Sequence, residues 1–152
     1  MVELDAKKEV AELFTGLCLQ KLVELGKVER EQVNGKWYVE FNVTKLKNKG
    51  LAGAATLDSF DRPVMYLLPE LNLDGLMWIV AHEAVHLMQI CKGDLIPDYG
   101  YKIWKGQKYQ SLPNEHLDYF EAQPWEKEAD ELHSILLEHL KSKVPAPDSG
   151  AT

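Results

Sequence analysis

His82-Glu83-Ala84-Val85-His86 is the stretch that most constrains the fold and the chemistry of this chain. On a helix, positions i and i+4 lie one above the other on the same face, so the two imidazoles can reach one metal ion. Glu83 follows the first histidine, where its carboxylate can take a proton from water at that metal. Neutral imidazole suits zinc, and a catalytic zinc site needs three protein ligands and one position for water. The stretch therefore predicts a zinc site with His82 and His86 as ligands and Glu83 as general base.

The residues around this motif predict a buried helix from Leu71 to Cys91. Asn72 or Asp74 can cap its start, and Lys92-Gly93 is a typical helix end. Apolar side chains lie on nearly every face of the segment, a pattern typical of a helix inside a protein core. The polar exceptions are His82, Glu83, His86 and Gln89. A buried polar group needs a partner, and a shared metal ion provides one for two histidines at this spacing.

Length and charge narrow the classes of protein to which the chain can belong. The 152 residues predict a single domain over residues 1–143 and a disordered tail over residues 144–152, which is rich in proline and small residues. Acidic residues outnumber basic ones by 24 to 17, which gives a net charge of −7. Nucleic-acid binding is built on basic patches, so this charge argues against a nucleic-acid partner.

Neither the cysteines nor the apolar segments point to secretion or to a membrane. Cys18 and Cys91 fall within apolar helical stripes and are expected to be reduced core residues. No signal segment is recognised at the start, and no apolar run reaches the roughly 20 residues of a membrane-spanning helix. These features predict a soluble, cytoplasmic protein without a membrane partner.

Apolar periodicity before the metal helix predicts one helix and three strands. The helix is amphipathic, extends from about Leu4 to Leu25 and is ended by Gly26. Alternating apolar and polar residues predict a first strand at Trp37 to Val43. A basic turn and two further strands follow, at Lys45 to Gly50, Leu51 to Leu57 and Val64 to Leu68.

A hairpin and a final helix complete the expected order of elements. The hairpin is expected over Tyr99 to Tyr109 with Lys105-Gly106 at its turn. The last helix begins at Pro124, because proline is favoured at the first helical position, and extends to about Lys143. Strands that follow one another beside helices, rather than alternating with them, predict an α+β fold.

The third metal ligand is sought among the acidic and histidine residues after His86. The candidates are Asp94, Asp98, Glu115, His116, Asp118, Glu121, Glu126, Glu128, Asp130 and His133. The inward-packing apolar stripe of the last helix consists of Trp125, Ala129, Leu132, Leu136 and Leu140. Glu126, Asp130 and His133 flank this stripe and can face the metal helix. Glu128 and Glu131 are expected to point towards solvent.

This helix register favours Glu126 as the third ligand. Asp130 lies one turn further on, where its carboxylate can accept the second N–H of a ligand histidine. Zinc histidines usually have such an outer partner, which fixes the ring tautomer. Two histidines and one glutamate form the ligand set of one large class of metalloproteases.

The two motifs together resemble those of the gluzincin zinc peptidases. His82-Glu83-x-x-His86 followed by Glu126-x-x-Ala129-Asp130 is most similar to the short ImmA/IrrE-type and HtpX-like domains, in which a Glu-x-x-Ala-Asn/Asp helix supplies the third ligand. The run from Pro124 to Ala129, with Trp104-x-Gly106 and Tyr109 before it, is also similar to small metallopeptidases encoded by phages. The resemblance implies a zincin-like fold and zinc held by the two histidines and the glutamate.

The resemblance covers roughly Leu51 to Leu137, and the chain departs from the pattern in two respects. No Phe-Ala follows Asp130, as it often does in ImmA/IrrE-type members, and no helix-turn-helix segment is recognised in the 152 residues. SprT-like domains share the preceding strand layout but use histidine as the third ligand. His116 and His133 therefore remain alternatives to Glu126.

The leading hypothesis is a zinc-dependent endopeptidase that acts on a peptide or protein substrate. The substrate would lie extended along the edge of the sheet and pair with it through main-chain hydrogen bonds. Glu83 would deprotonate the attacking water and pass the proton to the leaving amine. The oxyanion needs a further donor, for which Tyr109, Tyr119 and His133 are unranked candidates.

The alternative hypothesis is a zinc-containing regulatory or binding protein with a structural or vestigial site. The small size of the domain supports it, since so short a chain forms little of a specificity cleft. A structural site, however, is closed by a fourth protein ligand and needs no glutamate beside the first one. Glu83 therefore favours the peptidase hypothesis.

Overall fold

The computed structural model describes residues 2–47, 50–97, 101–110 and 123–144 and has an α+β fold. Its elements, in chain order, are α1 (Val2–Glu24), α2 (Arg30–Val33), β1 (Tyr38–Phe41), α3 (Val43–Lys47), β2 (Gly53–Leu57), β3 (Pro63–Leu67), α4 (Leu73–Lys92), β4 (Leu95–Pro97), β5 (Tyr101–Trp104), β6 (Gln107–Gln110) and α6 (Pro124–Lys143). The expected class is confirmed, with an N-terminal helix, small sheets and a C-terminal helix. The predicted tail, apart from Val144, lies outside the described residues.

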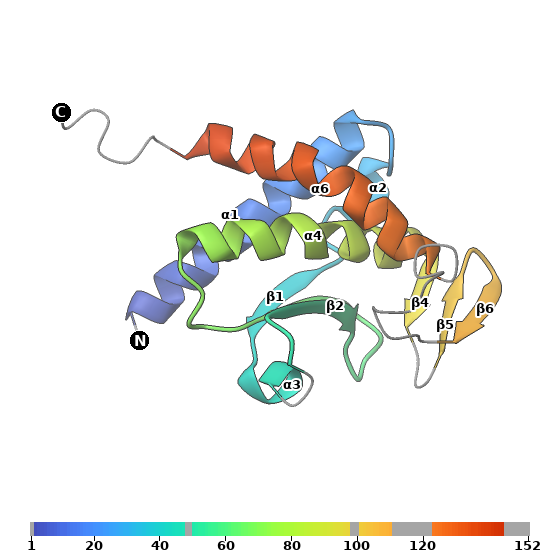
Figure 1. Cartoon of the computed structure of the whole chain (residues 1–152), viewed down its shortest axis with the longest axis horizontal. Helices are drawn as coiled ribbons and strands as arrows, with labels where there is room; N and C mark the ends of the chain where they lie inside the picture. The colour runs from blue at the N-terminus through green and yellow to red at the C-terminus, as the bar shows by residue number, and fades with distance from the viewer. Residues whose placement is uncertain (1, 48–49, 98–100, 111–122, 145–152) are drawn as a thin grey trace.

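Helix α4 lies at the centre of the fold, with a sheet on one side and the helices α1 and α6 packed against its other faces (Figure 1). Gln89, near the end of α4, bonds to Trp125 at the start of α6, whereas Trp78 meets His133 further along α6. The two helices are therefore antiparallel. This arrangement brings the middle of α4, which carries the His-Glu-x-x-His motif, against the first half of α6.

The first sheet has the strand order β1-β3-β2. Strand β1 is parallel to β3, with Val39 opposite Met65, and β2 is antiparallel to β3, with Ala55 opposite Met65. The central strand β3 is buried from Val64 to Leu67, as expected for an apolar run that is covered on both faces. Within the described sheet β2 is an edge strand, and it packs beside α4.

Gly53 allows β2 to approach α4 closely. A Cβ at this position would overlap the Cγ2 of Ile79 on α4 and would lie 3.2 Å from Cδ2 of Leu67. Glycine leaves room for the Ile79 side chain at this point, because it has no Cβ of its own. The close approach holds the main chain of β2 beside the metal motif.

The second sheet is an antiparallel meander with the order β4-β5-β6. Lys105 and Gly106 connect β5 to β6 with φ angles of 50° and 83°. Two successive positive φ angles are typical of a type I′ hairpin turn, whose twist matches that of the strands. The predicted hairpin and its turn are therefore confirmed within residues 101–110, whereas Tyr99 lies outside the described residues.

The ends of α4 match the expected signals. The side chain of Asn72 accepts a hydrogen bond of 2.8 Å from the Gly75 N–H, which satisfies one of the unpaired donors at the helix start. Gly93 ends the helix with a φ of 86°, a left-handed conformation that glycine adopts without strain. These two caps fix the length of the helix that carries His82 and His86.

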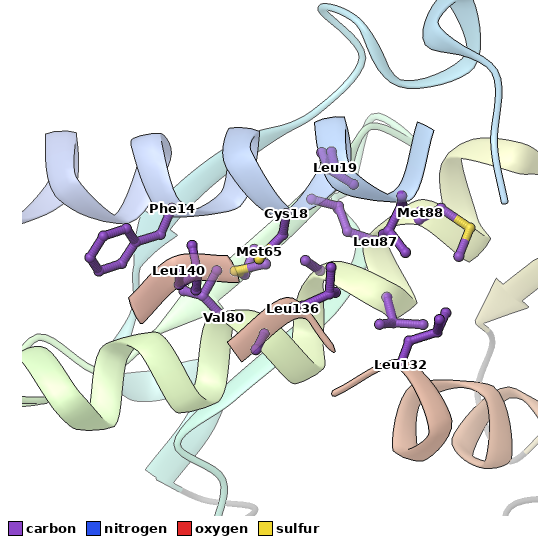
Figure 2. Packing of buried hydrophobic residues seen from close by; sticks show 14 of the residues in the cluster. Phe14, Cys18, Leu19, Met65, Val80, Leu87, Met88, Leu132, Leu136 and Leu140 are labelled. Atoms are coloured by element: carbon purple, nitrogen blue, oxygen red, sulfur yellow. The ribbon is translucent and has the colours of Figure 1, made fainter. Parts of the chain in front are cut away.

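The hydrophobic core lies where α1, α4 and α6 meet the first sheet (Figure 2). Phe14 and Cys18 from α1 and Met65 from β3 pack there with buried residues of α4 and α6. The contributions of α4 and α6 labelled in Figure 2 are Val80, Leu87, Met88, Leu132, Leu136 and Leu140. This core determines how α6 is rotated against α4.

Three short elements differ from the expectation. Helix α3 begins at Val43, the expected end of the first strand, and includes the start of the expected basic turn from Lys45 to Gly50, because the side chain of Asn42 accepts a 2.9 Å hydrogen bond from the Lys45 N–H. Helix α2 and strand β4 were not expected. Gln32 supports α2 by accepting a 3.0 Å bond from the Glu29 N–H.

Cys18 and Cys91 are both free, as expected. Burial raises the pKa of the Cys18 thiol to about 12, so this side chain remains an uncharged part of the core. Of the helices in the described part of the chain, none combines the length and the apolar character that a membrane crossing requires.

Candidate metal centre

His82 and His86 of α4 meet Glu126 of α6 in one cluster that could hold a metal ion. Nε2 of His82 lies 3.4 Å from Oε1 of Glu126, and Nε2 of His86 lies 3.3 Å from Oε2. The three ligating atoms are all within 4.8 Å of one another. Ligands about 2.0–2.1 Å from a tetrahedral zinc ion stand about 3.3–3.4 Å apart, so the spacing fits such an ion.

The register of α6 places Glu126 in this cluster. Pro124 is at the first helical position, and the buried residues of α6 are Trp125, Ala129, Leu132, Leu136 and Leu140. This is the stripe that the sequence predicts. Glu126 lies at the edge of the stripe, and its side chain is 21% exposed, against 25% for His82 and 8% for His86. The cluster is therefore closed on the His86 side and accessible to solvent on the other.

Gln89 fixes the tautomer of His86. Its amide nitrogen donates to the backbone oxygen of Trp125 at 3.0 Å and to Oε1 of Glu128 at 2.9 Å. Both partners are acceptors, so the orientation of the amide is determined and its oxygen faces Nδ1 of His86 at 2.8 Å. Nδ1 must therefore carry the hydrogen in this bond, and in neutral His86 the atom Nε2 carries the lone pair.

The lone pair of His86 points at another acceptor. Nε2 of His86 is buried and, in the neutral ring, has no hydrogen-bond partner, while the carboxylate of Glu126 lies 3.3 Å from it. Two acceptors at this distance repel each other unless a cation lies between them. The cation is either a proton or a metal ion, and the two imidazoles and one carboxylate are donors that zinc accepts.

The pKa values of His86 and Glu126 also indicate that a cation lies between them. Burial lowers the pKa of His86, but the facing carboxylates of Glu126 and Glu83 outweigh burial and raise it to about 9. Burial raises the pKa of Glu126, but its bonds to His82 and His86 hold it well below the usual range. In the absence of a metal, a proton is therefore held between His86 and Glu126 at neutral pH.

Glu83 lies beside the cluster without belonging to it. Its carboxylate accepts a hydrogen bond from the backbone N–H of Ala55 on β2. Burial raises the pKa of Glu83, while His86 and His82 act in the opposite direction. A half-buried carboxylate with a raised pKa next to the ligands has the properties of a general base.

The structure bears on two expectations about α6. Asp130 was expected to accept the second N–H of a ligand histidine; it is exposed, and for His86 that N–H is bonded to Gln89 instead. Glu128 was expected to face solvent, but it is only partly exposed and accepts the bond from Gln89. Both differences arise because Gln89 reaches across from α4 to the first turn of α6. A role of Asp130 towards His82 stays a prediction.

Among the remaining candidates, His133 lies next to the cluster. Its ring centroid is 5.9 Å from that of His82 and 4.5 Å from that of Trp78, and its buried Nε2 has no hydrogen-bond partner. Trp78, which was not singled out from the sequence, stacks at 6.5 Å on His82 and is 52% exposed. Its i, i+4 relation to His82 on α4 is the signal that could have identified it.

Other predicted residues lie elsewhere. Tyr109 packs against Trp125 with ring centroids 5.5 Å apart, and Asp94 pairs with Lys92 at 3.3 Å. The residues that fall outside the described part of the chain are Asp98, Glu115, His116, Asp118, Tyr119 and Glu121. Among the described residues the structure thus brings together His82, His86 and Glu126, with Glu83 and His133 beside them.

Comparisons with known proteins add no information about this centre. Neither protein-family models nor curated proteins nor solved structures match the chain. The function must therefore be inferred from the donor set, its geometry and the residues beside it.

Proposed function

We propose that this chain is a zinc-dependent endopeptidase with a zincin-like fold. His82, His86 and Glu126 would hold the metal, and Glu83 would act as the general base. The observation that carries the proposal is the 3.3 Å distance between Nε2 of His86 and Oε2 of Glu126, two acceptors that need a cation between them. Glu83 supports hydrolysis rather than structural metal binding, because its carboxylate is bonded to β2 and not to the ligands.

The donor set supports zinc. Two imidazoles and one carboxylate leave a fourth tetrahedral position for water, which is the composition of catalytic zinc sites. The same donors also hold iron in non-haem oxygenases. Glu83 favours zinc because hydrolysis by a metal-activated water needs a base beside the metal.

The reaction divides between the metal and the protein. Zinc held by His82, His86 and Glu126 would supply a Lewis acid that polarises the scissile carbonyl and lowers the pKa of water to about 7. Glu83 takes the proton of the attacking water and then passes it to the leaving amine. The bond from Ala55 holds the Glu83 carboxylate in place for both transfers. His133 lies beside His82 and is the residue that we propose as the donor to the oxyanion.

The edge of β2 supports an extended peptide as the substrate. The bonds Leu68 N–H to Ala52 O, at 3.1 Å, and Asp58 N–H to Arg62 O, at 2.9 Å, are on the side of β2 that pairs with β3. In an antiparallel pair these bonds alternate, so the main-chain groups of Gly53, Ala55 and Leu57 face the other side. The Ala55 N–H is taken by Glu83, so a substrate strand would pair with the other main-chain groups of this edge, next to Glu83.

The proposal is tested with the zinc-loaded chain and a mixture of unfolded proteins, with new N-termini identified by mass spectrometry. Glu83→Gln should retain one zinc per chain and the native fold and should lose cleavage, because the amide cannot accept a proton. Glu131→Gln, which changes an exposed glutamate of α6, is the matched control and should cleave like the unchanged chain.

Two outcomes would contradict the proposal. Loss of zinc in Glu83→Gln would assign Glu83 to the metal ligands instead of to proton transfer. A zinc-loaded chain that cleaves no peptide under any condition in which it binds zinc would favour the alternative, a regulatory or binding protein with a zinc site.

A further inference from the structure

The amide of Gln89 is completely buried, and all of its hydrogen-bond donors are used. A glutamine amide has two N–H donors and one carbonyl oxygen. The two donors are bonded to the Trp125 backbone oxygen at 3.0 Å and to Glu128 Oε1 at 2.9 Å, and the oxygen is bonded to His86 Nδ1 at 2.8 Å. This residue therefore connects one metal ligand of α4 to the first turn of α6.

The residues that Gln89 contacts on α6 lie on either side of the third ligand. Trp125 precedes Glu126 in the chain, and Glu128 follows it within the same turn. Two bonds from a rigidly packed amide fix the rotation of this turn about the helix axis. That rotation determines whether the Glu126 carboxylate points at His82 and His86, which it meets at 3.4 and 3.3 Å.

No other side chain of similar size satisfies these three partners. A glutamate at this position could accept from His86, but it would have no hydrogen for the Trp125 oxygen or for the Glu128 carboxylate. A methionine fills a similar volume and offers neither donor nor strong acceptor. Only an amide both sets the His86 tautomer and holds α6.

We propose that Gln89 is a positioning residue for the metal site. It sets the tautomer of His86 and the rotation of α6, the helix that carries Glu126, before the metal binds. It keeps a hydrogen on Nδ1 of His86, so that Nε2 is the nitrogen that gives up its proton and binds the metal, and it holds the turn of α6 that carries Glu126. The role rests on the metal site of the proposed function but not on peptidase activity. The partner of the second N–H of His86 is thus a neutral residue on α4 itself and not a carboxylate of α6.

The test measures the affinity of the full chain for zinc by competition with a chromophoric chelator, and the visible absorption of the cobalt-loaded form. Gln89→Met should weaken zinc binding by about 10- to 100-fold, the effect typical of an outer partner. Gln89→Glu should also weaken it, because the new carboxylate faces Glu128. The double variant Gln89→Glu/Glu128→Gln restores a donor at position 128 and should recover part of the affinity and the tetrahedral cobalt spectrum.

A core variant separates positioning from general destabilisation. Leu140→Ala truncates a fully buried residue of α6 far along the helix from Glu126, and it should lower stability without changing zinc affinity. Zinc affinity of Gln89→Met equal to that of the unchanged chain, or lowered no more than in Leu140→Ala, would overturn the proposal. So would a double variant that binds no better than Gln89→Glu.

The same measurements distinguish this role from the proposed activity. If the unchanged chain binds zinc and Gln89→Met weakens binding as expected, the role of Gln89 is supported even when no peptide is cleaved. If the unchanged chain binds neither zinc nor cobalt, both the metal site and the role of Gln89 are wrong.

Discussion

Nε2 of His86 and Oε2 of Glu126 lie 3.3 Å apart, and the bond from Nδ1 of His86 to Gln89 leaves no hydrogen between them in the neutral ring. The pair therefore requires a proton or a metal ion. Because the two side chains come from α4 and α6, the cation also links these two helices, which pack against each other. Metal binding, protonation and helix packing are consequently coupled at one point of the fold.

Zinc should displace the proton held between His86 and Glu126. The pKa of His86 is raised to about 9, so the ring is protonated at pH 7 and must lose that proton when it binds the metal. Zinc binding at pH 7 should release about one proton, and affinity should therefore fall about tenfold when the pH is lowered by one unit near neutrality. Calorimetry in buffers of different ionisation enthalpy measures the number of protons released. No proton release at pH 7 would show that His86 is neutral without metal.

Glu126→Ala should lower zinc affinity more than any other single change on α6. It removes a direct ligand, whereas loss of an outer partner costs about 10- to 100-fold. Asp130→Ala should cost less than about tenfold, because Asp130 is exposed and Gln89 already accepts the N–H of His86. Competition titrations compare the two variants. An Asp130→Ala effect as large as that of Glu126→Ala would place Asp130 among the ligands.

Gly53→Ala should destabilise the fold by about 1–3 kcal/mol, the usual cost of overpacking. The added Cβ would overlap the Cγ2 of Ile79 and push β2 away from α4. Gly16→Ala is the matched control: its Cβ meets nothing within 4 Å, and alanine in a helix should stabilise by about 0.5–1 kcal/mol. Urea unfolding measures both, and Ile79→Ala should relieve part of the Gly53→Ala defect. Equal stability of Gly53→Ala and the unchanged chain would contradict the close packing of β2 on α4.

Asp58 should make the fold sensitive to acid. Burial raises its pKa, but bonds from the Arg62 and Phe60 N–H groups and from the Tyr38 hydroxyl outweigh burial and lower it from 3.8 to about 2. The folded value lies below the unfolded one, so the stabilisation is present above pH 4 and is lost as pH falls towards 2. Asp58→Asn should flatten the decline in unfolding free energy between these pH values. An unchanged slope in this variant would assign the decline to other carboxylates.

The group that could hold a metal ion, His82, His86 and Glu126, could be predicted from the sequence because helix geometry determines where each residue lies on its helix. His82 and His86 share a face at any i, i+4 spacing, and the apolar stripe ending in Leu136 and Leu140 determines which side of α6 turns inward. Glu126 lies at the edge of that stripe together with Asp130 and His133, and the resemblance to the gluzincin pattern favours Glu126 among them. The helix positions follow from the periodicity of single helices, whereas the choice among the three residues does not.

The partners of these ligands could not be predicted in the same way. Gln89 appeared in the sequence only as a polar exception on a buried helix, and Glu128 as a charge on an exposed face. Their bond depends on how α4 crosses α6, which one helix's periodicity does not determine. Helix α3 could not be predicted either. Its lysines are typical of a turn, but the side chain of Asn42 caps the segment and stabilises it as a helix.

The most direct test of the account is a crystal structure of the zinc-loaded chain, with the metal located by its anomalous signal. The account predicts one zinc ion per chain, bound by Nε2 of His82, Nε2 of His86 and the carboxylate of Glu126. Glu83 should remain unbound to the metal, and one position should be open to water. Zinc at another place, or a fourth protein ligand that closes this site, would contradict the account.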